Sequence, residues 1–132
     1  TSTQLLVDIP ENLPKIVVDR IMIEQVLLNL VKNGIEAMHG IPIERRCLSL
    51  KARQLDDRMV EVSVADQGHG IEEGDIERIF APFYTTKSEG MGIGLAICRS
   101  IIEFHQGRLW VEPRREGGTV FRFTVPIEEN DA

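Results

Sequence analysis

The spacing of apolar residues changes several times along the chain, and these changes restrict the fold more than any other sequence feature. Short alternating apolar stretches predict strands, whereas apolar spacings of three and four residues predict helices. The expected strands cover residues 4–10, 46–55, 59–68, 108–113 and 119–126. The expected helices are a long one at 20–38 with Asp19 as its N-cap, a second at about 92–106 closed by Gly107, and a short one within 74–83 that stops before Pro82. One sheet with helices on one face, an α/β sandwich, fits this order.

The composition sets limits on the class of protein. The chain has 132 residues, 42% hydrophobic and 27% charged, which suits one globular domain over residues 1–132 with a core at about 5–126. The net charge of −6 argues against non-specific nucleic-acid binding, which needs a basic surface. No apolar run approaches the 18 or so residues of a membrane span. We therefore expect neither a nucleic-acid partner nor direct membrane contact. Cys47 and Cys98 lie in apolar runs and are expected to be small buried side chains.

The first long helix carries an unusual polar stripe. Gln25, Asn29, Asn33 and Glu36 follow one another at intervals of four, four and three, so they share one face. Asn and Gly are poor helix formers, and Gly34 directly follows Asn33. Two interpretations stay open at this point: an ordinary solvated face, or a polar wall facing a ligand.

An aspartate leaves the third expected strand directly into a glycine turn. Asp66 is followed by Gly68 and Gly70, a composition that an ordinary turn would also have. The alternative is a carboxylate that accepts hydrogen bonds from a ligand N–H, for example an adenine amine, with glycine backbone against the base.

Three glycines alternate in GMGIGLAI, at Gly90, Gly92 and Gly94, just before the second long helix. Exposed N–H groups at such a helix start suit an anion, and Lys87 could add a positive charge. The dinucleotide fingerprint is not met because Leu95 stands where its last glycine is required. The Walker pattern is absent as well.

Taken in order, the motifs LLNLVKNGIEAM, DQGHGI, IFAPFYTTK, GMGIGLAI and GGTVFRFTVP resemble the nucleotide-binding domain of two-component sensor histidine kinases. They correspond to that family's N box, first glycine box, F box, second glycine box and closing strand. The wording of the N and F boxes is similar to the nitrogen- and oxygen-sensing branch. The resemblance implies the Bergerat (GHKL) fold, a mixed, mainly antiparallel sheet of about five strands with about three helices on one face.

The resemblance also implies a role for each matching residue. Asn33 matches the ligand of a Mg²⁺ ion that bridges the phosphates of ATP, and Asn29 matches a second polar residue near the metal. Asp66 matches the acceptor of the adenine amine. The remaining residues implied to contact nucleotide, through the adenine pocket, the lid or the phosphate cradle, are Gly68, Gly70, Ile71, Phe83, Lys87, Gly90, Gly92, Gly94, Leu95 and Thr119. Glu36 departs from the pattern, since many members have Lys or Arg there.

The resemblance implies a protein-histidine kinase that transfers the γ-phosphate of ATP, leaving ADP, to a histidine on a separate dimerisation domain. That domain, the sensor region and a downstream response regulator are expected outside this chain. None of His39, His69 and His105 has the expected setting of a phosphoacceptor. A cytoplasmic location is implied, whether or not the parent protein is anchored in a membrane.

Other members of the fold offer alternatives: ATP-driven clamps, anti-sigma serine kinases, or a module that binds nucleotide without transferring phosphate. The clamps and serine kinases place a glutamate base four residues before the metal asparagine. Here that position is Asn29, which cannot take a proton.

Overall fold

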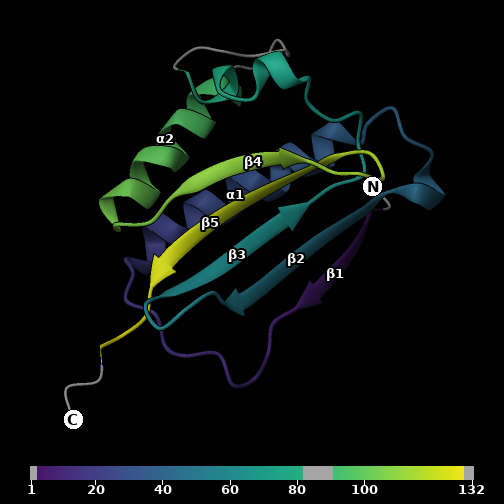
Figure 1. Cartoon of the computed structure of the whole chain (residues 1–132). Helices are drawn as coiled ribbons and strands as arrows, with labels where there is room; N and C mark the ends of the chain where they lie inside the picture. Colours follow the sequence, from purple (N-terminus) through teal and green to yellow (C-terminus); the bar gives the residue numbers. More distant parts are fainter. Residues whose placement is uncertain (1–2, 82–90, 130–132) are drawn as a thin grey trace.

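The computed structural model describes residues 3–81 and 91–129 of the chain, which form a five-stranded sheet and its helices (Figure 1). The strands are β1 (Gln4–Asp8), β2 (Cys47–Gln54), β3 (Met59–Ala65), β4 (Leu109–Pro113) and β5 (Thr119–Pro126). Their order across the sheet is β1-β2-β3-β5-β4. The pairing of β1 with β2 is parallel, and the other three pairings are antiparallel. The mixed, mainly antiparallel sheet is therefore confirmed.

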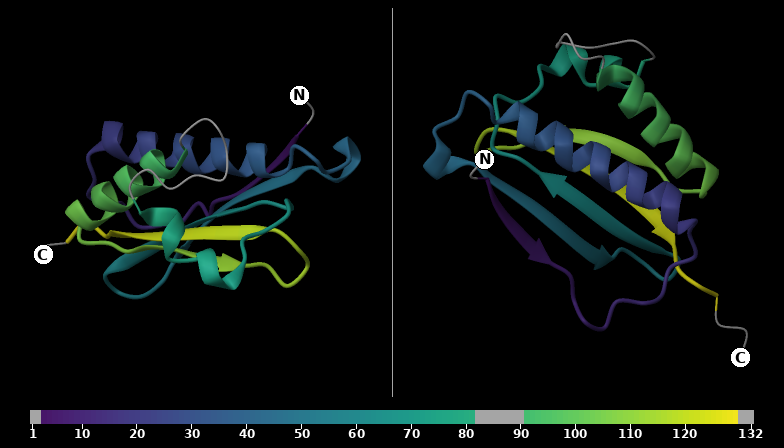
Figure 2. Two further views of the ribbon diagram at one scale, coloured as in Figure 1. Left: turned by 90° about the horizontal axis from the view of Figure 1, so that it is seen from above. Right: turned by 180° about the vertical axis from the view of Figure 1, so that it is seen from behind.

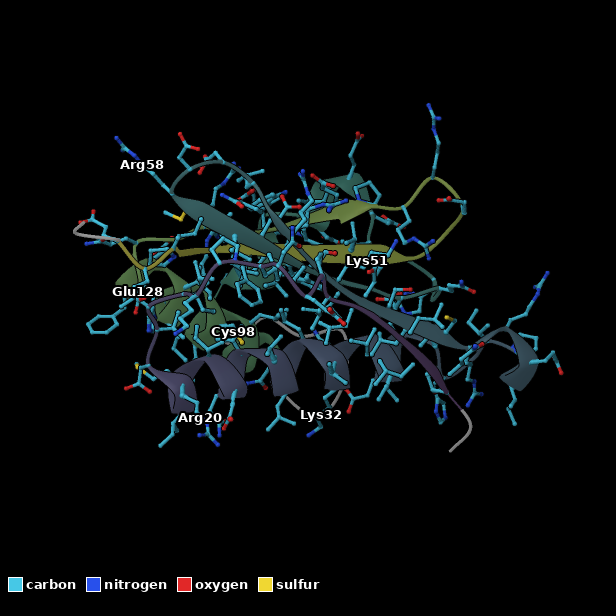
Figure 3. All side chains as sticks on the ribbon, turned by 90° about the horizontal axis from the view of Figure 1, so that it is seen from below. Arg20, Lys32, Lys51, Arg58, Cys98 and Glu128 are labelled. Carbon is cyan, nitrogen blue, oxygen red and sulfur yellow. The ribbon has the colours of Figure 1, made fainter. Side chains whose placement is uncertain are left out.

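Two long helices, α1 (Arg20–Ala37) and α2 (Met91–Phe104), lie on the same side of this sheet (Figure 2). Val26 and Leu30 of α1 and Cys98 and Ile102 of α2 are fully buried, as is Phe123 of β5. Figure 3 shows Arg20 and Lys32 pointing away from the sheet on the outer side of α1. Within the described ranges, no helix is both long and apolar enough to cross a membrane.

The face of the sheet opposite α1 and α2 carries a row of ion pairs. Glu61 of β3 is 5% exposed and accepts hydrogen bonds from Arg53 of β2 at 3.0 Å and Arg122 of β5 at 3.3 Å. Arg122 also donates to Glu112 of β4 at 3.0 Å. Four strands are thus linked by charge pairs on the face away from α1 and α2.

Helix α1 begins where the sequence predicts. The Asp19 side chain accepts a hydrogen bond from the Met22 N–H at 3.0 Å, as a helix N-cap does. The cap satisfies one of the N–H groups that have no partner inside the helix.

Helix α2 ends differently from the expectation that Gly107 closes it. The residue in the left-handed region is Gln106, with φ of 65°. Gly107 donates its N–H to the Ile102 carbonyl at 2.9 Å. A Cβ at Gly107 would lie 1.9 Å from the Thr124 carbonyl oxygen, so close backbone contact, not a positive φ, requires the glycine.

The short helix expected within residues 74–83 is two separate 3₁₀ turns, η2 (Glu73–Asp75) and η3 (Arg78–Phe80); a third such turn, η1 (Ile43–Arg45), precedes β2. The Ala81 N–H donates to the Arg78 carbonyl at 2.9 Å, a bond of the 3₁₀ type. So short a segment cannot offset the cost of starting an α-helix. Burial of Ile79 and Phe80 holds it against the core instead.

Candidate functional site

Asp66 occupies the point where β3 leaves the sheet, and it is only 3% exposed. Its backbone N–H donates to the Thr119 carbonyl at 2.9 Å, which extends the β3–β5 ladder by one bond. Its Oδ1 accepts the Gly68 N–H at 2.8 Å. The carboxyl group is therefore fixed by the first residues of the turn that it opens.

The environment of Asp66 acts on its protonation in both directions. Burial is the largest influence and raises the pKa of the carboxyl group above its ordinary value. Hydrogen bonds from the backbone of Gly68 and Thr119, and the charges of Arg114 and His69, act in the opposite direction on the pKa. A buried carboxylate of this kind gains free energy from any additional N–H donor that a ligand brings.

Gly34 brings the C-terminal half of α1 directly against this aspartate. A Cβ at Gly34 would lie 2.5 Å from Leu48 Cδ1 and 3.5 Å from Asp66 Cβ. The glycine that weakens the helix therefore allows α1 to lie on the ends of β2 and β3. Asn33 is the residue that precedes this glycine in α1.

The turn after Asp66 is packed between α1 and the β4–β5 connection. A Cβ at Gly68 would lie 2.3 Å from the Ala37 carbonyl oxygen. Gly70 has φ of 81°, and its Cβ position faces the Gly118 carbonyl oxygen at 3.3 Å. Gly68 is thus required by backbone packing and Gly70 by its positive φ, and neither reason is the predicted approach of a base to the main chain.

Asn29 lies where α1 meets α2. Its Nδ2 donates to the Gln25 carbonyl at 3.0 Å, and its Oδ1 would be 3.1 Å from a Cβ at Gly94. A hydrogen bond from Asn29 also reaches the Cys98 thiol, whose pKa burial raises to about 11. Asn29 therefore joins the first turn of α2 to α1, and a side chain larger than glycine at Gly94 would crowd it.

The polar stripe of α1 is not simply a solvated face. Asn29, Asn33 and Glu36 are half-buried, and only Gln25 is exposed. This burial favours the interpretation of the stripe as a wall of the site.

The other predicted residues fall into three groups. Thr119 is buried beside Asp66, and Ile71 is partly buried against the core. Leu95 is 6% exposed and belongs to the core, and Gly92 lies in the first turn of α2. Phe83, Lys87 and Gly90 lie outside the described residues.

The donor set suits Mg²⁺ better than a softer metal. Within residues 3–81 and 91–129, no three His, Cys, Asp or Glu side chains are grouped as ligands for a metal ion. The Asn33 side chain offers a hard carbonyl oxygen. Mg²⁺ commonly takes one or two protein oxygens and completes its shell with water and substrate phosphates. The residues present fit such an ion.

Sequence reasoning missed two residues of this site, Arg114 and Gly118. Arg114 Nη1 donates to the Asp66 carbonyl oxygen at 2.9 Å. Gly118 has φ of 99°, and a Cβ there would lie 2.2 Å from the same oxygen. The only signal was the turn composition RREGG, which does not reveal what the turn touches.

We compared the chain with known protein families and found a match over most of its length. A profile of the family described as histidine kinase-, DNA gyrase B-, and HSP90-like ATPase matches residues 18–129. Sensor protein FixL of Bradyrhizobium diazoefficiens is 45% identical over 116 residues, 88% of this chain and 23% of FixL. C4-dicarboxylate transport sensor protein DctS of Rhodobacter capsulatus is 46% identical over 120 residues, 91% of this chain and 18% of DctS. The chain thus spans less than a quarter of either relative.

Solved structures of histidine kinases have the same fold as this chain. The nucleotide-free catalytic domain of histidine kinase ThkA is 38% identical, with a TM-score of 0.83 over 96% of this chain and 80% of that one. ThkA in complex with the response regulator protein TrrA is 37% identical, with a TM-score of 0.76 over 94% of this chain and 34% of that one.

Proposed function

Because the chain belongs to the histidine kinase-, DNA gyrase B-, and HSP90-like ATPases, with the fold of a sensor histidine kinase catalytic domain, we propose that it binds Mg·ATP and donates the γ-phosphate to a histidine on a separate dimerisation domain. Residues 1–132 form the ATP-binding catalytic part of that kinase. ADP is the product that leaves the site.

The observation that carries the proposal is the buried carboxyl group of Asp66 at the end of β3. It is held by the Gly68 N–H and lies against Gly34, one residue from Asn33. An ionised carboxylate accepts hydrogen bonds and donates none, so it selects a ligand that presents an N–H group, such as the adenine amine. Thr119, Ile71 and the turn glycines Gly68 and Gly70 are proposed to line the pocket for the base.

The phosphates are assigned to the stretch of the polar stripe around Asn29 and Asn33, on the side where α1 meets α2. Asn33 would hold Mg²⁺, which would neutralise charge on the phosphate oxygens. Asn29 keeps Gly94 and the first turn of α2 in place, and Leu95 anchors that turn in the core. Phe83, Lys87, Gly90 and Gly92 are proposed to complete the lid and the phosphate cradle.

The acceptor histidine belongs to another domain. The Nε2 of His105 accepts the Asp19 N–H at 2.9 Å, and its Nδ1 faces the Ile101 carbonyl at 2.8 Å. Both ring nitrogens are thus engaged in the fold, which leaves neither available as a nucleophile. A response regulator downstream of that other domain is the proposed second partner, in line with the complex of ThkA with TrrA. The site of action is proposed to be the cytoplasm, where ATP is available.

Calorimetric titration with ADP and ATP, with and without Mg²⁺ and with GTP as control, tests the binding step. Adenine nucleotides are expected to bind and guanine nucleotides are not. Absence of ADP binding to folded protein would contradict the proposal.

A dimerisation domain carrying a phosphoacceptor histidine, supplied in trans with γ-labelled ATP, tests the transfer step. Label on that histidine, lost in Asn33→Ala, is expected because the metal ligand is removed. Binding of ADP without label on any histidine domain would leave only a nucleotide-binding module and exclude the kinase.

A further inference from the structure

The connection between β4 and β5 forms a tight turn directly over Asp66. The Arg114 N–H donates to the Gly118 carbonyl at 3.0 Å, and the Gly117 N–H donates to the Arg114 carbonyl at 3.1 Å. Gly117 and Gly118 have φ of 104° and 99°, values that L side chains rarely adopt. The position of Arg114 is therefore fixed by the backbone of its own turn.

From this position the Arg114 side chain reaches the end of β3. Its Nη1 donates to the Asp66 carbonyl oxygen at 2.9 Å, across 48 residues of sequence. The same β4–β5 hairpin also receives the Asp66 N–H, at the Thr119 carbonyl. Both backbone polar groups of Asp66 are thus held by one hairpin, which limits how the residue can rotate.

We infer that Arg114 is a positioning residue for adenine recognition, which fixes the Asp66 backbone and sets a positive charge beside the carboxylate that meets the base. This inference rests on the proposed function. Arg114 does not touch the nucleotide in this account; it acts through Asp66.

The charge of Arg114 counters the effect of burial. Burial raises the pKa of the Asp66 carboxyl group, and Arg114 lowers it. His69 acts in the same direction as Arg114, and the contact from α1 is Gly34, which carries no charge. The ionised carboxylate accepts a hydrogen bond from the adenine amine more strongly than the protonated group does, so loss of Arg114 should make binding more sensitive to acid.

The chain offers a matched control in Arg115. It is the next residue of the same turn, carries the same charge and is exposed. Arg114→Met and Arg115→Met therefore change the net charge equally. Arg114→Lys keeps a positive charge but loses the planar guanidinium. His69 is present in all three variants, so its contribution to the Asp66 pKa is common to them.

Two measurements test the inference: the ADP dissociation constant by calorimetry from pH 5 to pH 8, and the Asp66 carboxyl titration by NMR without nucleotide. Arg114→Met is expected to weaken ADP binding about tenfold at pH 7, the usual effect of losing a charge-assisted hydrogen bond. The loss should grow as the pH falls, and the Asp66 titration midpoint should move upward. Arg114→Lys should recover part of the affinity, and Arg115→Met should match the wild type.

Three other outcomes would contradict the inference or the proposed function. Equal affinity and equal titration for Arg114→Met and Arg115→Met would exclude the positioning role. A loss of affinity that is constant with pH, with no recovery in Arg114→Lys, would show that Arg114 only maintains the turn. If the wild type bound no ADP, both the proposed function and this inference would fail. If the wild type bound ADP and Arg114→Met bound it equally well, only this inference would fail.

Discussion

The two ends of helix α1 are attached to the molecule in different ways. At the C-terminal end, Gly34 lies against Asp66 and the Ala37 carbonyl lies against Gly68, so the contacts are between backbones without space for a side chain. At the N-terminal end, side chains make the attachment. Asp19 caps the helix, and its N–H donates to Nε2 of His105 at the end of α2.

This difference suggests that one end of α1 affects nucleotide binding and the other affects the stability of the fold. The contacts of the C-terminal end set the place of Asn33 relative to Asp66, and both are proposed to bind the nucleotide. The contacts of the N-terminal end join α1 to α2 far along the helix from those residues. Changes at the first end should therefore alter nucleotide binding, and changes at the second should alter the free energy of unfolding only.

The largest expected effect is that of Gly68→Ala. The added Cβ would lie 2.3 Å from the Ala37 carbonyl oxygen, and a backbone group cannot move aside as a flexible side chain can. We expect a loss of about 3 kcal/mol in the free energy of unfolding, together with loss of ADP binding. Urea denaturation and calorimetry measure the two effects. Gly74→Ala is the control, because no heavy atom lies within 4 Å of its Cβ position. Equal stability of the two variants would refute the close contact.

Asp66→Asn should weaken ADP binding at least tenfold, because an amide cannot replace the charge-assisted acceptance of the carboxylate. Stability should not fall in parallel. Since burial raises the folded-state pKa of Asp66, its contribution to stability is greatest at low pH and is lost as the pH rises through that pKa.

At pH 7 the Asp66→Asn variant without nucleotide should therefore melt at the wild-type temperature or above it. The difference in melting temperature between the variant and the wild type should become smaller as the pH falls. Melting curves between pH 4 and pH 8 measure this, and a large drop in melting temperature at pH 7 would contradict the assignment.

His105→Leu tests the N-terminal end. The substitution leaves the Asp19 N–H and the Ile101 carbonyl without their ring partners, so a loss of about 2 kcal/mol in the free energy of unfolding is expected. ADP affinity, measured well below the melting temperature, should stay within about twofold of the wild type if the two ends are independent. His39→Leu, at an exposed position, is the control. A marked loss of affinity in His105→Leu would mean that the two ends are coupled.

Asp19→Ala should have the smallest effect, about 1 kcal/mol of stability, the usual cost of a lost N-cap. Glu24→Ala in the same part of α1 removes only an exposed ion pair with Arg20 and should change little. Chemical denaturation of both variants compares the cap with the ion pair. Similar losses would mean that the cap contributes nothing beyond surface charge.

Local signals in the sequence predict much of this fold. The alternation of apolar and polar residues predicts all five strands. Asp19 can be recognised as an N-cap because the hydrogen bond of a cap is local, here to the N–H of Met22, three residues later. Asp66 was recognisable because it follows a strand and precedes two glycines. The short helix was found as 3₁₀ turns, and the reason for Gly107 differs from the expected one. Both depend on the packing of Phe80 and on the Thr124 carbonyl rather than on local composition.

The contacts that escaped prediction join distant parts of the chain. Arg114 and Asp66 are 48 residues apart, and Asp19 and His105 are 86 apart. Nothing in RREGG or at the end of the second long helix marks the partner. The roles predicted for Asn33, Thr119 and the lid residues remain predictions about a bound nucleotide, for which the titrations above are the test.

The order of the strands also has a consequence for how the protein acquires its binding site. The β2–β3 and β4–β5 pairings are hairpins of low contact order, whereas β3–β5 joins the two hairpins across the chain and ends at Ala65 and Val120, next to Asp66 and Thr119. In a refolding chain the proposed adenine site therefore forms only after the two hairpins have paired. A nucleotide present during refolding would bind only the chain in which both hairpins are paired. It would therefore stabilise the folded state without changing the separate hairpins.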